Sequence, residues 1–325
     1  MLSRTAENLF WMARHIERAE NTARILDVAH RSSLVPLDLE GAEAYLWYAP
    51  LNITGCALGY EEKHGLARAR EVTHYMALDS DNPSSIYNCL KAARENARSV
   101  RGAITSEMWE VINGTWLEVN RLARDFDESN YSDFFEWVKE RSHLFRGVTL
   151  GTIIKDISLS FIRLGTFLER ADNSARILDV KYHILLPSVH DVGGAADYYQ
   201  WGSLLRSVSA FEAYRKIYRD VISPLKVAEL FILRDDMPRS LHACFNEIET
   251  SLGHINGSSG REVRRLAGEI HANLHFGRIE DVFARGLHEY LTDFLASMDV
   301  LGREIRNAYL SRREDLYDVS FSQVA

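Results

Sequence analysis

The sequence predicts an all-helical protein built from two tandem copies of about 150 residues each, and two observations lead there. Residues 15–28 (HIERAENTARILDV) return as residues 167–180 (FLERADNSARILDV), with ten identities in fourteen positions at an offset of 152. Apolar residues recur with helical periodicity almost everywhere, and the chain has six prolines and few alternating strand patterns. We therefore expect a helical bundle of about ten to twelve helices and no sheet.

Two further blocks repeat in the same order. Residues 42–47 (AEAYLW) parallel residues 196–201 (ADYYQW), and residues 78–90 (LDSDNPSSIYNCL) parallel residues 233–245 (LRDDMPRSLHACF). A period of this length is too long for a solenoid repeat. The blocks therefore predict two copies that fold against each other about a pseudo-twofold axis.

This order predicts a single domain over residues 1–325, with a first repeat over 1–150 and a second over 151–325 that ends in a loose C-terminal tail. Pro83 and Pro238 are expected in the first turn of the helices that follow, because that turn tolerates proline. The clearest flexible tip is the sequence GHINGSSG. Breaks between helices are expected at residues 34–41, 79–85, 127–133, 186–195, 234–238 and 253–260.

Charge and composition exclude several classes of protein. The 38 Lys and Arg residues against 46 Asp and Glu give a net charge of −8, which argues against a general nucleic-acid binder. No apolar run approaches the roughly 20 residues that span a membrane, and the N-terminus does not read as a signal peptide. Cys56, Cys89 and Cys244 are too few and scattered for a disulfide framework, so we expect core packing and a cytoplasmic, reduced protein.

The repeated segment places polar residues on one side of a helix. At about 100° per residue, Glu17, Asn21 and Arg24 fall within an arc of about 60°. Apolar residues share that side, so the helix is predicted to be covered nearly all round and its polar groups to be paired. The second copy is expected to present the same group through Glu169, Asn173 and Arg176.

Two interpretations of this polar face stay open. In the structural one, Glu17 meets Arg170 or Arg176 across an interface between the copies, and the reverse pair forms as well. In the functional one, the face binds or processes a ligand, with Glu17 or Glu169 as an acid or base tuned by burial beside Arg18 or Arg170. Buried ionic networks are weak sources of stability compared with apolar packing, which keeps the ligand interpretation open.

A second candidate site lies in the first copy alone. Arg94, Arg98 and Arg101 are spaced i, i+4, i+7, share one predicted helix face and could hold a phosphate or carboxylate. Trp109 and Asn113 follow on the next predicted helix. The corresponding stretch of the second copy reads NEIETSLGHI, so the stripe is not duplicated. The alternative is a solvated charged face.

Metal-binding patterns are weaker. The pair His271 and His275 lacks the glutamate of a zinc protease between its histidines and is expected to be a surface or capping pair. Gly-rich phosphate loops and nucleophile elbows are missing, and we expect no cofactor and no metal. The Glu-x-x-His spacing of di-iron bundles occurs three times but is not preserved between the copies, so a metal-dependent helical oxidoreductase is the weakest hypothesis; the pairs are Glu61/His64, Glu71/His74 and Glu140/His143.

Three stretches carry a resemblance to a known family: ENLFWMARHIERAENTARILDV, ARENARSVRGAITSEMWEVIN and LGTFLERADNSARILDV. They resemble the Alpha-E family, an all-helical domain named for its Glu-Arg motif, over essentially the whole chain. Members of that family are encoded or fused beside circularly permuted ATP-grasp proteins and transglutaminase-like cysteine peptidases. The resemblance therefore implies these two partners and a system that forms or modifies peptide or amide bonds.

The resemblance places the family motif on Glu17 and Arg18, and again on Glu169 and Arg170. We expect an accessory helical component that binds a peptide or small anionic ligand in a polar groove between the repeats. Its arginine stripe would clamp an anion and its motif glutamates would hold an amine or order the arginines. The alternative, an enzyme with Glu17 or Glu169 as acid or base, stays open. The further family-like polar positions are Asn21, Arg24, Arg98, Arg101, Trp109 and Asn113.

Overall fold

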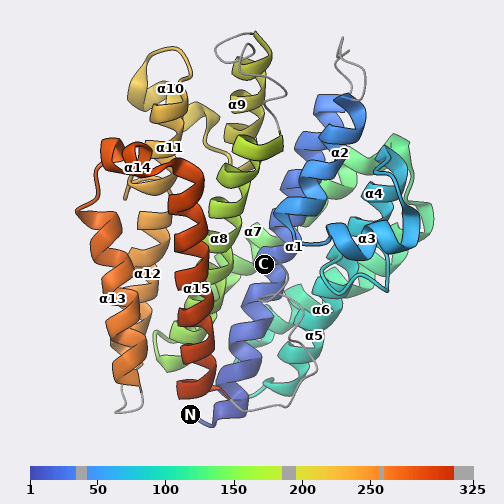
Figure 1. The fold of residues 1–325 in the computed structure, drawn as a ribbon. Helices are drawn as coiled ribbons and strands as arrows, with labels where there is room; N and C mark the ends of the chain where they lie inside the picture. Colours follow the sequence, from blue (N-terminus) through green and yellow to red (C-terminus); the bar gives the residue numbers. More distant parts are fainter. Residues whose placement is uncertain (34–41, 185–194, 256–259, 311–325) are drawn as a thin grey trace.

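The computed structural model describes residues 1–33, 42–184, 195–255 and 260–310, and these residues form helices without strands (Figure 1). The predicted all-helical class is confirmed. The expected number of ten to twelve helices was too low, because the described residues contain fifteen α-helices and two short 3-10 helices. Several helices are too short for apolar periodicity to reveal. They are α3 (Ala57–His64), α10 (Phe211–Tyr218) and α14 (Ile279–Arg285).

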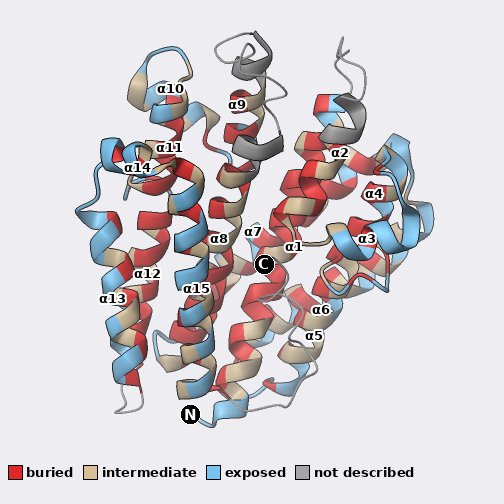
Figure 2. Ribbon diagram, viewed as in Figure 1, coloured by how far each residue is buried: buried red, intermediate tan, exposed pale blue. Residues whose placement is uncertain are grey.

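Two long helices form the centre of the molecule. Helix α1 (Ser3–Ser33) and helix α8 (Ile157–Ile184) contain the two repeated segments and make the most extensive contact of any helix pair. Figure 2 shows both helices mostly buried along their length. The sequence prediction that residues 15–28 lie in a helix covered on nearly all sides is confirmed, since polar and apolar residues of α1 alike are buried.

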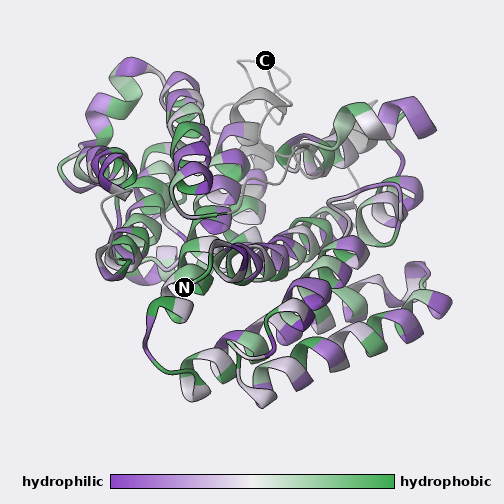
Figure 3. Ribbon diagram, turned by 90° about the horizontal axis from the view of Figure 1, so that it is seen from below, coloured by the Kyte–Doolittle hydropathy of each residue, from purple (hydrophilic) through white to green (hydrophobic). Residues whose placement is uncertain are grey.

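Three further helices of the same half of the chain assemble around each central helix, and two of the three contact it directly. Helix α1 contacts α5 and α7, and α6 packs on both; helix α8 contacts α12 and α15, and α13 packs on both. In Figure 3, a view from below, most helices carry hydrophilic and hydrophobic residues along their length, as expected for helices with one covered side. The six helices are α5 (Ile86–Ser99), α6 (Ser106–Leu122), α7 (Tyr131–Thr152), α12 (Leu241–His254), α13 (Arg261–His275) and α15 (Leu287–Tyr309).

The remaining elements are shorter and pack around these groups of helices. None of the helices in the described part of the chain is long and apolar enough to cross a membrane. The elements not yet named are α2 (Ala42–Ile53), α4 (Ala69–Ala77), α9 (Ala195–Ser207), α11 (Pro224–Ile232) and the 3-10 helices Ala123–Asp125 and Glu128–Asn130.

The expected breaks at residues 79–85 and 234–238 are followed by two helices that begin in the same way. Helices α5 and α12 begin after Ser85 and Ser240, whose hydroxyls accept the backbone N–H of Asn88 and Ala243. These caps satisfy amides that have no partner inside the helix. The expectation that Pro83 and Pro238 stand in the first helical turn was wrong, because each proline precedes the serine cap.

Other expected boundaries differ. The break at residues 127–133 is occupied by a 3-10 helix and the start of α7. The predicted tip at 253–260 overlaps α12, which continues to His254, and its residues 256–259 lie outside the described residues. The break at 34–41, nearly all of that at 186–195, and the C-terminal tail beyond residue 310 lie outside the described residues.

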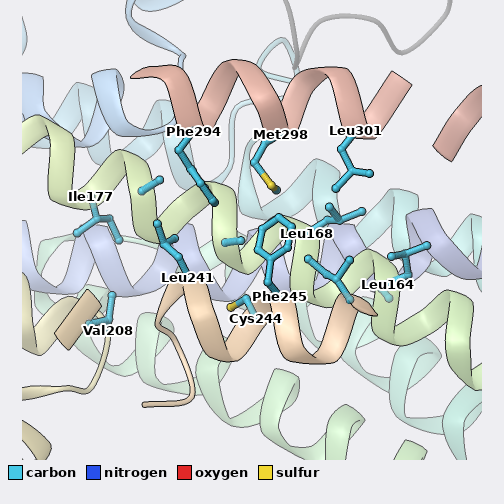
Figure 4. Packing of buried hydrophobic residues seen from close by; sticks show 14 of the residues in the cluster. Leu164, Leu168, Ile177, Val208, Leu241, Cys244, Phe245, Phe294, Met298 and Leu301 are labelled. Carbon is cyan, nitrogen blue, oxygen red and sulfur yellow. The ribbon is translucent and has the colours of Figure 1, made fainter. Parts of the chain in front are cut away.

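The apolar core fills the space around α8. Leu168, Phe245 and Met298 come from α8, α12 and α15 and meet in the close-up of Figure 4. The same cluster extends onto α1, α5 and α6, so buried apolar residues run without interruption from one half of the chain to the other. A Cβ atom built on Gly165 of α8 would lie 2.3 Å from the carbonyl oxygen of Phe10, so α1 and α8 cross at backbone contact here.

Candidate functional site

The repeated Glu-Arg pairs meet between α1 and α8. Glu17 accepts two hydrogen bonds from Arg170, from Nε at 2.9 Å and from Nη2 at 2.9 Å. Glu169 in turn accepts from Arg18, from Nε at 2.5 Å and from Nη2 at 3.0 Å. Both glutamates and Arg170 are buried, and Arg18 is largely buried. The motif glutamate of each segment therefore pairs in two-point fashion with the motif arginine of the other.

Further arginines, not expected from the sequence, complete this network. Arg14 donates from Nε to Glu169 at 2.8 Å. Arg239 donates to Glu17 at 3.0 Å and also to Asn21 at 2.9 Å. Arg146 of α7 donates to Glu17 at 3.1 Å. We call the motif residues and these three arginines, together with Glu20, the central ionic network.

The sequence held a signal for two of these three arginines. Arg14 stands opposite Thr166 in the aligned segments, and Arg239 stands opposite Ser84 within an otherwise similar block. A charge that appears in only one copy of a repeated segment has a role that the other copy does not share. No comparable pattern surrounds Arg146, which only the packing of α7 against α1 brings to Glu17.

The arginines keep the buried carboxylates ionised. Burial by itself would raise the pKa of Glu169, but Arg18 and Arg14 outweigh it and lower that pKa to about 2. Burial likewise opposes ionisation of Glu17, whose pKa is nevertheless lowered by Arg170 and Arg239. A carboxylate with so low a pKa is a weak proton acceptor at neutral pH, and one without a proton cannot act as an acid. These properties suit ion pairing better than proton transfer.

A second carboxylate of α1 extends the network toward the surface. Glu20 accepts from Arg239 at 2.5 Å, from Arg24 at 2.8 Å and from the hydroxyl of Ser142 at 2.6 Å, and it also pairs with Arg146. The burial of Glu20 would raise its pKa, but Arg239 heads the neighbours that hold this pKa well below its usual range.

Arg24 connects the network to two other parts of the chain. Its Nη1 donates to the hydroxyl of Ser209 at 2.7 Å, and its Nη2 lies 3.2 Å from Nε2 of His143 on α7. Ser209 adopts a left-handed backbone conformation, with φ of 56°, in the turn after α9. Since the side chains of His143 and Arg146 are 55% and 28% exposed, this margin of the network is open to solvent.

Cations outnumber carboxylates in this part of the network. Two carboxylates, Glu17 and Glu20, are contacted by four arginines, which gives a formal charge of +2. The side-chain N–H groups of Asn21 are buried and have no hydrogen-bond partner among the described residues. Hydrogen-bond donors are therefore in excess at the same place, as an anion-binding site requires. The four arginines are Arg24, Arg146, Arg170 and Arg239.

The second copy does not present an equivalent polar group, contrary to the sequence expectation. Asn173 and Arg176 are half-buried rather than buried. Arg176 pairs at 2.9 Å with Asp172 of its own helix, so the partner of Glu17 is Arg170 and not Arg176. The i,i+4 pair of Arg24 with Glu20 has its counterpart in Arg176 and Asp172, whereas Glu20 is also contacted by Arg146 and Arg239, which come from other elements.

The predicted arginine stripe is only partly assembled. Helix α5 ends at Ser99, so Arg101 lies beyond the helix and the expected shared helix face was wrong. Arg101 instead stacks on the ring of Trp109, 4.6 Å from its centroid. Arg98 is exposed and pairs with Glu95 of its own helix. Surface exposure and the neighbouring Glu95 make Arg98 a weak anion clamp.

The remaining residues of this patch are held together across two helices. Nε of Arg94 donates to Oδ1 of Asn113 at 2.9 Å, and its guanidinium lies 5.8 Å from the Trp109 ring. Arg94 and Arg101 therefore flank Trp109 in cation–π contact. This patch lies on α5, on α6 and in the turn between them.

Three cysteines and three Glu-x-x-His pairs were also singled out. Cys89 and Cys244 are buried in the core, as expected, and burial raises the pKa of each thiol to about 12. Cys56 is half-buried. Among the residues the structure describes, none of the Glu-x-x-His pairs belongs to a group of three side chains close enough to share a metal ion.

A small recess adjoins the network on the side of the first bundle. It lies between α1, α5, α6 and α7 and measures about 350 Å³ including its opening to solvent. Its walls are mainly apolar, with polar groups from Thr115, Arg141 and Ser142. Ser142 also donates to Glu20, so the recess borders the carboxylate-bearing face of α1.

Comparison with known proteins agrees with the resemblance noted in the sequence. The model of the Alpha-E family, described as a predicted alpha-helical domain with a conserved ER motif, matches residues 1–310. Uncharacterized proteins of Mycobacterium bovis and Mycobacterium tuberculosis are each 24% identical over 324 residues, covering 93% of this chain. The alignment covers 36% of each relative, so the chain spans about one third of their length. No solved structure matches the chain.

Proposed function

Because the chain belongs to the Alpha-E family, we propose that it is an accessory helical component of an ATP-grasp-linked pathway that forms or modifies peptide or amide bonds. An ATP-grasp protein and a transglutaminase-like protein are the partners that the family resemblance implies. The length of the relatives supports an accessory role, since the helical region makes up about one third of those longer chains.

In this proposal the Glu-Arg motif connects two halves of related structure. The two motif segments pair reciprocally, Glu17 with Arg170 and Glu169 with Arg18, which is the pattern that a pseudo-twofold axis between the segments produces. The pairing leaves the motif glutamates saturated with hydrogen bonds. Their role is then to fix α1 against α8 and to order the surrounding arginines.

The ligand-binding part is the solvent-exposed margin of the network, formed by His143 and Arg146, together with the buried Arg24 that contacts His143. The observation that carries this assignment is the excess of four arginines over two carboxylates, with the unpartnered amide N–H groups of Asn21 beside them. A carboxylate or phosphate would balance that charge. Such a group occurs on the substrates and products of carboxylate activation, the chemistry of the proposed pathway.

An experiment with the purified chain tests this assignment. We would titrate the protein, by calorimetry, with inorganic phosphate and with the dipeptide Gly-Gly as a carboxylate probe. Arg146→Ala removes a charged donor and should weaken binding of the preferred probe about 10- to 100-fold. Arg146→Lys, which keeps a cation but loses the two-point geometry, should bind with intermediate affinity.

Arg265→Ala supplies the matched control, because Arg265 is a half-exposed arginine of α13 paired with Glu262 and Glu269. It should bind as wild type does. Circular dichroism and thermal denaturation would confirm that each variant is folded. Equal affinity of wild type and Arg146→Ala for both probes, or no binding of either probe by wild type, would overturn the assignment. Co-purification with an ATP-grasp protein, and its effect on product formation, tests the pathway separately.

A further inference from the structure

We propose that His242, His271 and His275 form a binding site for a Zn²⁺ ion between α12 and α13. Among the described residues, these three are the group of possible metal ligands whose donor atoms all lie within 4.8 Å of one another. The i, i+4 spacing puts His271 and His275 on one face of α13. His242 stands in the first turn of α12, which packs against α13.

The spacing of two of the donor nitrogens matches zinc coordination. Nδ1 of His275 lies 3.3 Å from Nε2 of His242. A tetrahedral site with Zn–N bonds of about 2.0–2.1 Å separates its ligating nitrogens by about 3.3–3.4 Å. These two nitrogens therefore already stand at two corners of such a tetrahedron, and a metal ion would replace the weak contact between them.

Hydrogen bonds to the other ring nitrogens orient two of the three imidazoles. Nδ1 of His242 lies 2.9 Å from the carbonyl oxygen of Leu233, which can only accept, so Nε2 is left with a free electron pair. Nε2 of His271 lies 2.6 Å from Oδ1 of Asn246, which leaves Nδ1 free in the same way. Metal-binding histidines commonly have such outer partners, because they fix the tautomer and the ring orientation.

The graded burial of the three imidazoles leaves one coordination position of the proposed site open. His242 is buried, His271 is half-buried and His275 is exposed, so the fourth position faces solvent. Three histidines and a water molecule are a donor set that Zn²⁺ accepts.

The other half of the chain has the same contact without histidines. Tyr87 of α5 donates to Asn120 of α6 at 3.0 Å, at the same sequence separation of 33 residues as His242 and His275. The ring of Tyr87 also lies 5.0 Å from that of Trp116, which occupies the position that His271 has in the second half. Packing of such a helix pair thus requires no histidine, which leaves the three imidazoles to a different role.

Zinc binding by the chain, expressed without a polyhistidine tag and stripped with a chelator, tests the proposal. Calorimetric titration with ZnCl₂ should show one zinc ion per chain. Replacing His271 and His275 together by alanine should weaken binding at least about 100-fold, because two of three ligands are lost. Titration with Co²⁺ should give the visible absorption of a tetrahedral site in wild type and not in the double variant.

His254→Ala is the matched control, since His254 is an exposed histidine at the other end of α12. It should bind zinc as wild type does. Because His275 is exposed, His275→Gln should fold normally and separates loss of a ligand from loss of structure. Zinc binding by the double variant with wild-type affinity, or saturation of wild type well below one ion per chain, would overturn the site.

Discussion

At the scale of single residues, this protein holds an unusual amount of charge in its interior. Glu17, Glu20 and Glu169 are 1%, 0% and 5% exposed, and each is contacted by at least two arginines. A buried ion pair adds little net stability compared with an apolar pair, but removal of one partner leaves an uncompensated charge. The network therefore specifies how α1 and α8 align more than it strengthens their contact.

Glu169→Gln should destabilise the protein by about 3–5 kcal/mol, because the guanidinium groups of Arg14 and Arg18 would lose their shared counter-charge inside the molecule. The free energy of unfolding in urea measures this change. Glu118→Gln, which removes a carboxylate from an exposed pair with Arg121 on α6, should leave that free energy nearly unchanged. Similar losses of unfolding free energy in the two variants would contradict the prediction, because the buried pairing of Glu169 with Arg14 and Arg18 would then matter no more than an exposed ion pair.

The sequence predicted part of this residue-scale arrangement. The helical projection indicated that Glu17, Asn21 and Arg24 are covered, and all three are buried. The projection of one helix could not show that Arg146 approaches from α7, or that Arg239, which differs from the aligned Ser84, approaches from the turn before α12. Contacts between elements distant in the chain leave no periodic trace in the sequence of either one.

At the scale of elements, the distance between α1 and α8 depends on one residue without a side chain. Gly165 allows the backbone of α8 to reach the carbonyl of Phe10, and this close approach brings the motif arginines within hydrogen-bonding distance of their partners. Ordinary helix pairs lie about 8–10 Å apart, at a distance set by the side chains in the contact. A larger residue here would separate the helices along the whole network.

Gly165→Ala should accordingly destabilise the protein by about 1–3 kcal/mol or more, since the new methyl group would meet backbone rather than a movable side chain. Gly147→Ala on α7 is the control, because a Cβ atom there meets nothing within 4 Å. That substitution should stabilise the helix by about 0.5–1 kcal/mol. Thermal denaturation of both variants gives the comparison, and opposite signs are expected.

At the scale of the whole molecule, stability should fall steeply in acid. The pKa of Glu169 is lowered to about 2 and those of Glu17 and Glu20 are also lowered, so their contribution is present above about pH 4.5 and is lost as the pH falls toward 2. Burial, with Arg18, lowers the pKa of His15 to about 3. The folded protein thus keeps His15 neutral, and stability is lost as the pH falls from about 6.5 to 3.

His15→Phe separates the histidine from the carboxylates, and phenylalanine is the residue at the aligned position, Phe167. Between pH 6.5 and pH 5 the wild type should lose about 2 kcal/mol more stability than the variant. Below pH 4 both should lose stability together as the glutamates become protonated. Urea unfolding across this range, with a chelator present so that no bound metal contributes, measures the difference; parallel curves above pH 5 would contradict it.

The sequence by itself determined the helical class, the breaks before α5 and α12, and the polar composition of the two central helices. Periodicity, capping residues and repeated segments are local properties, so they can be read along one stretch of chain. Only the tertiary structure decided which arginine meets which glutamate, that Arg101 leaves the helix face it was expected to share, and that His242 joins His271 and His275. These outcomes depend on how α1, α7, α8, α12 and α13 pack, and long-range packing brings together residues whose separation along the chain carries no signal of contact.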